Sequence, residues 1–212
     1  MSKLRTIGNF QDRLDSELAW RIQEFSSLNS AISTAGSVTD KALIRASTAL
    51  IYAHWEGFIK NSSVLYVEFV NSRRLAYTQL SSVFAVIGLR NRIAAMLNDG
   101  PTKSQEAFDF VKNQLSNRAQ FDPQSAINTE SNLSSSVFKK ILETIGLEVT
   151  PYEGYSNFID KSLLKKRNSI AHGNYEELDR EGWIQLKDTT LLLIRMFKTD
   201  LENAASLKRY LC

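Results

Sequence analysis

The sequence contains few of the residues that interrupt helices or cross-link a chain. Among its 212 residues are three prolines and nine glycines. These are the two residue types least compatible with a helix interior, so their scarcity favours long, uninterrupted helices. The only cysteine is the last residue, Cys212. An internal disulfide is therefore excluded, which fits a protein that works in a reducing compartment.

Long hydrophobic runs are also lacking. No apolar run approaches the roughly 20 residues needed to span a bilayer, and no apolar signal core follows the first residues. The sequence therefore predicts a soluble, cytoplasmic protein with no membrane partner. It contains no glycine-rich phosphate loop, no cluster of metal ligands and no Ser–His–Asp order, so we expect neither a metal nor a cofactor.

The composition that remains is that of a folded, mildly basic protein. Hydrophobic residues make up 43%, which is enough for a sizeable core. The formal net charge is +3, which is compatible with binding to RNA but does not require it. The length predicts a single domain over residues 1–212.

Helical periodicity dominates the chain. Apolar residues recur at steps of three and four, and no segment alternates with a period of two. The expected helices span residues 10–32, 39–74, 83–97, 104–115 and 136–145. A motif helix that begins near Asn157 and a last long helix capped by Asp179 follow them. This pattern predicts an all-α fold, an antiparallel up-and-down bundle of four to five core helices with short accessory helices. Residues 117–135 are rich in Asn, Ser and Gln, and are expected to be a polar loop or insertion.

The most informative stretch is residues 165–173, KKRNSIAHG. Asn168 and His172 are four residues apart, so they share one face of a helix. Arg167 points to another face, but its long side chain can reach the same cleft. Attack on an RNA phosphodiester by its own 2′-hydroxyl needs proton transfer and positive charge on the phosphoryl oxygens, which His and Arg supply. Alternatively, a His followed by Gly173 is an ordinary helix C-terminus.

This stretch resembles the R-x4-6-H motif of the HEPN superfamily, in the form with a polar residue after the arginine. HEPN domains are small helical bundles, and many are metal-independent ribonucleases of toxin–antitoxin, CRISPR and phage-defence systems. The resemblance implies that Arg167, Asn168 and His172 form the catalytic site. Residues 52–58, YAHWEGF, resemble the early-helix signature of the bacterial MAE-type HEPN-like nucleases.

Two residues of the second segment are candidates for supporting roles. Glu56 is either a surface carboxylate beside Lys60 or the counter-charge that orients Arg167, because a buried arginine needs one. His54 lies on the apolar side of its helix. It is either a core histidine bonded to a carbonyl group or a second acid/base group.

Three lysines accompany the motif and are candidates for RNA binding. They are Lys161, Lys165 and Lys166. Such a group is commonly a solvated helix face, but beside the motif it would also attract a polyanion.

The function predicted from these features is that of a metal-independent endoribonuclease. The expected products are a 2′,3′-cyclic phosphate and a 5′-hydroxyl, and the expected role is that of a toxin or phage-defence effector, with a cognate antitoxin as a further partner. Cleavage needs two proton transfers, whereas one chain has one motif histidine, so we expect a homodimer with a composite site. The alternatives are a non-catalytic HEPN-like module that binds RNA or a nucleotide, and a helical partner protein of the antitoxin type.

Overall fold

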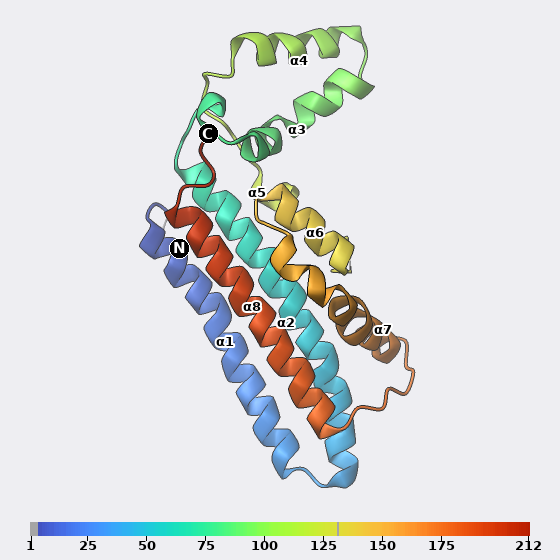
Figure 1. Cartoon of the computed structure of the whole chain (residues 1–212). Helices are drawn as coiled ribbons and strands as arrows, with labels where there is room; N and C mark the ends of the chain where they lie inside the picture. The colour runs from blue at the N-terminus through green and yellow to red at the C-terminus, as the bar shows by residue number, and fades with distance from the viewer. Residues whose placement is uncertain (1–3, 131) are drawn as a thin grey trace.

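The computed structural model describes residues 4–130 and 132–212 (Figure 1). The α-helices are α1 (Ile7–Thr34), α2 (Ser37–Ser72), α3 (Ser82–Asn98), α4 (Pro101–Asn113), α5 (Pro123–Ala126), α6 (Ser135–Thr144), α7 (Lys165–Ala171) and α8 (Arg180–Ser206). Two 3₁₀ segments, Tyr77–Gln79 and Thr150–Tyr155, and one π-helix, Phe158–Leu164, complete the described elements. The described residues form no strand, only two isolated β-bridges. The prediction of an all-α bundle is confirmed.

Three long helices, α1, α2 and α8, lie side by side and each packs against the other two (Figure 1). Helix α8 starts where α1 ends, because Arg180 donates a hydrogen bond to Ser33. It finishes near the end of α2, where the ring centre of Tyr210 lies 6.0 Å from that of Phe69 (Figure 1). Helix α8 is therefore antiparallel to α1 and parallel to α2. The π-helix and α7 run back along α2 and form the fourth member of the bundle.

Helix α2 is central because apolar side chains cover most of its circumference. Trp55, Phe58 and Ile59 are fully buried, as are Tyr66 and Phe69. A helix that is apolar on so many sides needs neighbours on all of them. Helices α1 and α8 cover two sides, while α5, α7 and the π-helix cover the others.

The described residues of the polar segment 117–135 are a packed part of this architecture. It contains α5, and Ala119 N donates to Leu75 O at 2.8 Å. Ile127 and Leu133 are buried in the core although the segment is rich in polar residues. The segment thus covers one side of α2 and brings its own polar side chains close to α7.

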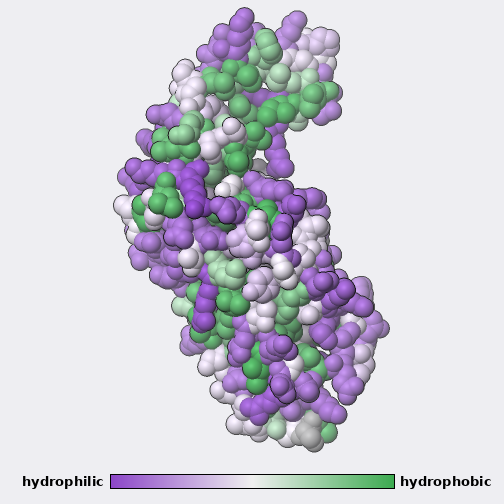
Figure 2. Space-filling view, in the orientation of Figure 1, coloured by the Kyte–Doolittle hydropathy of each residue, from purple (hydrophilic) through white to green (hydrophobic). Residues whose placement is uncertain are grey.

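Helices α3 and α4 form a hairpin that stands off one end of the bundle (Figure 1). Pro101 begins α4 directly after Gly100, where proline suits the first turn because its missing N–H has no helical partner. The hairpin exposes Leu97 and Phe108. Figure 2 shows hydrophobic surface at this end of the molecule.

Candidate functional site

The turn that ends α7 determines where His172 lies. Gly173 has φ +79°, a left-handed conformation that favours glycine. Gly173 N donates to Ile170 O and Asn174 N donates to Ser169 O, each at 3.0 Å. These two bonds are the Schellman arrangement that satisfies the last carbonyls of a helix. His172 is therefore the C-cap residue, and its side chain is exposed to solvent.

Arg167 is held by three neighbours. Its Nη1 donates to Asn168 Oδ1 at 2.7 Å and to Asn132 Oδ1 at 3.1 Å. Its guanidinium carbon lies 4.8 Å from the centre of the Tyr52 ring, within the range of a cation–π contact. The side chain is half-buried, so these contacts limit its movement while one edge remains accessible.

Tyr52 links α2 to the loop that carries Asn132. Its hydroxyl accepts a hydrogen bond from Leu133 N at 2.6 Å. Burial raises the pKa of Tyr52 to about 12, and the nearby Glu56 carboxylate acts in the same direction. The phenol therefore stays neutral at physiological pH. The sequence did not indicate Asn132, because it is one of many polar residues in segment 117–135 and the contact depends on how that segment folds back.

Glu56 does not take the position predicted for the counter-charge of Arg167. No carboxylate of the described residues forms an ion pair with this guanidinium, and its oxygen partners are amides. Helices α2 and α7 are antiparallel, with Arg45 beside Asn174 and Tyr52 beside Arg167. One turn beyond Tyr52, Glu56 is therefore level with residues that precede Arg167, and it adjoins the Tyr52 side chain instead.

Arg45 is a second cation beside the end of α7. Its Nη2 donates to Asn174 O at 3.2 Å, and its guanidinium carbon lies 5.2 Å from the centre of the Tyr175 ring. Sequence reasoning missed Arg45. The available signal was its spacing, because it lies seven residues, or two helical turns, before Tyr52 and so shares its face.

The three lysines differ in their surroundings. Lys161 and Lys165 are exposed. Lys166 is half-buried, and its Nζ lies 3.7 Å from Glu176 Oε2, which offsets part of its charge. Figure 2 shows the surface around α7 as largely hydrophilic. Lys161, Lys165, Arg167 and Arg45 form no ion pair with a carboxylate of the described residues, so these four cations remain available around α7.

His54 lies on a different face of α2 from Tyr52 and Glu56, because two residues along a helix correspond to a rotation of about 200°. It is buried against α1, with its ring centre 5.1 Å from that of Trp20. Its Nε2 lies 2.6 Å from Glu24 Oε2, although the approach is outside hydrogen-bond geometry. Burial lowers the pKa of His54, and Glu24 opposes this effect. The neighbour is thus a carboxylate and not the expected carbonyl, and His54 is not brought to Arg167.

The other residues of segment 52–58 pack the bundle. Trp55 is fully buried, with its ring centre 4.9 Å from that of Phe138. Gly57 faces the buried Arg21, where an added Cβ would lie 3.3 Å from Arg21 Nη2. The pattern that resembles a nuclease signature therefore combines core packing with one edge, at Tyr52 and Glu56, that faces the candidate site.

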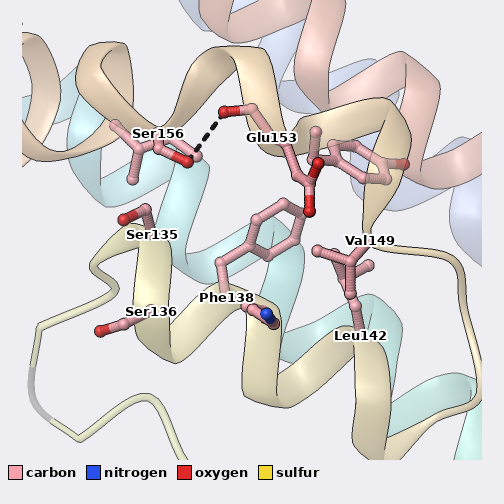
Figure 3. Close-up of a pocket in the computed structure, with 10 residues that line it drawn as sticks. Ser135, Ser136, Phe138, Leu142, Val149, Glu153 and Ser156 are labelled. Carbon is pink, nitrogen blue, oxygen red and sulfur yellow. Dashed lines mark hydrogen bonds between the residues drawn. The ribbon is translucent and has the colours of Figure 1, made fainter.

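A pocket of about 200 Å³ lies near the site, between α6 and the 3₁₀ segment Thr150–Tyr155 (Figure 3). Ser156 Oγ donates to Glu153 O at 3.0 Å across its rim. Ser135, at the start of α6, lines the pocket and donates from N and Oγ to Asp160 at 2.7 and 2.6 Å. The motif residues do not line this pocket. The two bonds from Ser135 to Asp160 link α6 to the π-helix.

The described residues contain neither a cluster of metal ligands nor a membrane-spanning helix. Within residues 4–130 and 132–212, no three His, Cys, Asp or Glu side chains lie close enough together to hold a metal ion. In the same residues, no helix is both long and apolar enough to cross a membrane.

Comparison with known proteins identifies the family. Residues 16–203 match the family model described as RiboL-PSP-HEPN. The chain therefore belongs to the RiboL-PSP-HEPN family, within the HEPN superfamily. No curated protein and no solved structure matches it. The match does not extend to the MAE-type group, so the likeness of residues 52–58 to that group stays a resemblance.

Proposed function

We propose that this protein is a metal-independent endoribonuclease that cleaves RNA by transesterification. The observation that carries the proposal is the fixed guanidinium of Arg167, held by Asn168, Asn132 and Tyr52 on the helix that ends at the exposed His172. Family membership supports the substrate class, because HEPN domains are commonly ribonucleases.

In the proposed reaction, the 2′-oxygen of a ribose attacks the adjacent phosphorus, and the bond from phosphorus to the 5′-oxygen breaks. One proton leaves the 2′-hydroxyl and another is added to the departing 5′-oxygen. His172 is assigned to proton transfer, because imidazole exchanges protons near neutral pH. Arg167 is assigned to the non-bridging oxygens, where negative charge increases in the transition state. The products are a 2′,3′-cyclic phosphate and a 5′-hydroxyl.

Asn132 and Tyr52 are assigned to positioning Arg167. A guanidinium that is fixed before the reaction does not have to be ordered during it, which increases its contribution to the rate. Arg45, with Lys161 and Lys165, is assigned to attracting the RNA backbone, since exposed cations around a site raise the local concentration of a polyanion.

The reaction needs a second proton-transfer group, and this need is the reason to propose a dimer. His54 faces α1 and does not meet Arg167 within one chain. We therefore propose a two-fold homodimer in which two α7 ends face each other and each contributes one His172. The exposure of His172 at the end of α7 supports this arrangement, because nothing in the described part of its own chain covers it.

The experiment that tests the reaction is incubation of the purified protein with total cellular RNA in excess EDTA, followed by mapping of the cut ends. Arg167→Ala and His172→Ala should each reduce cleavage by about 100-fold or more at unchanged helical content. Arg195→Ala is the matched control, because Arg195 is an exposed cation on α8. Cleavage that requires a divalent ion, or wild-type turnover by either folded variant, contradicts the proposal.

The outcome also separates the alternatives. RNA that stays intact while the protein binds it would favour a non-catalytic module, and no affinity for RNA would favour a helical partner protein. The biological role that we propose, a toxin or phage-defence effector with a cognate antitoxin, rests on likeness to the superfamily alone.

The dimer has its own test, in which wild-type chains are mixed with an excess of chains that carry both Arg167→Ala and His172→Ala. In a shared site the lesions enter the mixed dimers, so the activity per wild-type chain should fall well below half, whereas a site within one chain would leave it unchanged. Sedimentation measured in parallel gives the fraction of dimer. Full activity at concentrations where only monomer sediments would contradict the shared site.

A further inference from the structure

The α3–α4 hairpin contains a second candidate site, at the end of the molecule away from α7 (Figure 1). A cavity of about 440 Å³ lies between α3, α4, the 3₁₀ segment Tyr77–Gln79 and the chain that follows α4. A neighbouring cavity of about 400 Å³ shares Asn91, Arg92 and Phe110 with it. Small-molecule sites typically have volumes of this order.

Arg92 is the most distinctive group in this cavity. Its guanidinium carbon lies 3.7 Å from the centre of the Phe110 ring, so the planar cation is stacked and oriented. Arg118 lines the same cavity. Among residues 4–130 and 132–212, no carboxylate forms an ion pair with either arginine. Asp122 also lines the cavity, but its Oδ1 accepts from Gln124 N at 3.2 Å and caps α5. Neither guanidinium is therefore ion-paired, and the cavity lining contains two positive charges against the one negative charge of Asp122.

The remaining lining groups suit a heterocyclic base. Tyr77 and Phe121 supply aromatic walls, while Asn91, Asn117 and Gln120 supply amide donors and acceptors. Single-stranded nucleic acids are bound in this way, because bases stack on aromatic rings or guanidinium planes and their edges pair with amides.

The cavity is preformed by its backbone. Tyr77 N donates to Asn117 O at 3.3 Å, and Ala119 N donates to Leu75 O at 2.8 Å. Gly88 allows close packing at the wall, because a Cβ added there would lie 2.7 Å from Tyr77 Cε1. A site that needs little ordering on binding retains more of its interaction free energy.

We propose that this cavity binds a nucleotide, with the phosphate between Arg92 and Arg118 and the base against the aromatic and amide walls. This inference goes beyond the proposed cleavage function, because binding here needs neither His172 nor Arg167. The same chemistry is offered by a free nucleotide and by one residue of an RNA strand. If the bound nucleotide belongs to an RNA strand, the α3–α4 hairpin would bind the substrate at a position away from the bond that is cleaved.

Two probes distinguish these sources. Calorimetry with uridine monophosphate measures binding of the free nucleotide. Fluorescence anisotropy with a labelled 2′-O-methyl oligouridine measures binding of a strand, and this probe cannot be cleaved because it lacks a free 2′-hydroxyl. The oligonucleotide is also tested in an Arg167→Ala background, so that the α7 site does not account for the signal.

The diagnostic variant is Arg92→Met, which keeps the apolar contact with Phe110 and removes the charge. It should weaken binding by at least about tenfold, because hydrogen bonds to charged groups are among the strongest polar contacts. Arg90→Met is the matched control on the same helix. Arg90 lines another cavity and donates to Ser125 O at 3.2 Å, so this variant should bind like the wild type. Arg118→Met provides a second test if Arg92→Met fails to fold.

The combination of probe and variant identifies which ligand the cavity binds. Binding of uridine monophosphate that is lost in Arg92→Met and retained in Arg90→Met supports a free-nucleotide site. The same pattern with the oligonucleotide alone supports a strand-binding site. The proposal is overturned if the wild type binds neither probe, or if Arg90→Met and Arg92→Met weaken binding equally.

Discussion

Replacing Tyr52 by phenylalanine tests how the polar loop is attached to the bundle. The Tyr52 side chain is almost fully buried, and its hydroxyl accepts from Leu133 N at 2.6 Å. Leu133 has no exposed surface, so water cannot replace the lost acceptor without a rearrangement. The substitution keeps the aromatic ring, and with it the packing and most of the cation–π contact with Arg167.

The expected cost is that of leaving one buried N–H without a partner, roughly 1–3 kcal/mol. Truncation of the whole ring, as in Tyr52→Ala, would cost more, roughly 3–5 kcal/mol, because it would also open a cavity. In a chain of this length, 1 kcal/mol corresponds to a shift of about 2–4 °C in the melting temperature. Asn132 adjoins Leu133 and bonds to Arg167, so a looser loop should also lower RNA cleavage, but less than Arg167→Ala does.

The assays are urea unfolding followed by circular dichroism, hydrogen exchange of the Leu133 amide, and RNA cleavage. Tyr152→Phe is the matched control, because its buried hydroxyl donates to Asp200 Oδ2 at 2.6 Å and does not contact Arg167. Tyr152→Phe should lower the free energy of unfolding, but it should not reduce RNA cleavage as Tyr52→Phe does. If Tyr52→Phe unfolds within about 0.5 kcal/mol of the wild type, a typical surface effect, the reasoning about Leu133 is wrong.

Three further predictions concern α6, α1 and the end of α7. Asp160→Asn should lower the free energy of unfolding in urea by about 1 kcal/mol, because it weakens the hydrogen bonds from Ser135 at the start of α6. An unchanged urea midpoint would refute this. Burial lowers the pKa of His54 below 6.5 in the folded chain. On acidification the unfolded chain therefore binds the proton first, so the free energy of unfolding should be highest above about pH 6.5 and should fall at lower pH. His54→Phe should remove part of that fall in urea midpoints measured across pH, and an unchanged slope would contradict the assignment. Arg45→Met should weaken binding of an uncleavable RNA by about tenfold. The melting temperature should fall only slightly, because the lost bond to Asn174 O is exposed, and equal affinity would exclude Arg45 from the RNA surface.

Much of the fold follows from local pattern. Steps of three and four between apolar residues predicted α2 over residues 39–74, and the structure has Ser37–Ser72. Apolar side chains cover most of the circumference of α2, and the structure places neighbours on those sides. The glycine after His172 predicted the end of the motif helix, and Gly173 adopts the required positive φ. Each of these features depends on residues close together in the chain, so the sequence alone contains the signal.

The surroundings of the candidate site depend on long-range packing. Asn132 meets Arg167 because segment 117–135 folds back over α2, and Glu56 misses it because of the register between α2 and α7. His54 is paired with Glu24 because α1, and not α7, covers that side of α2. The sequence determined that the fold is helical and which residues end or line its helices. Only the tertiary structure decided which neighbour each polar group meets, because periodicity reports that a helix face is covered but not which element covers it.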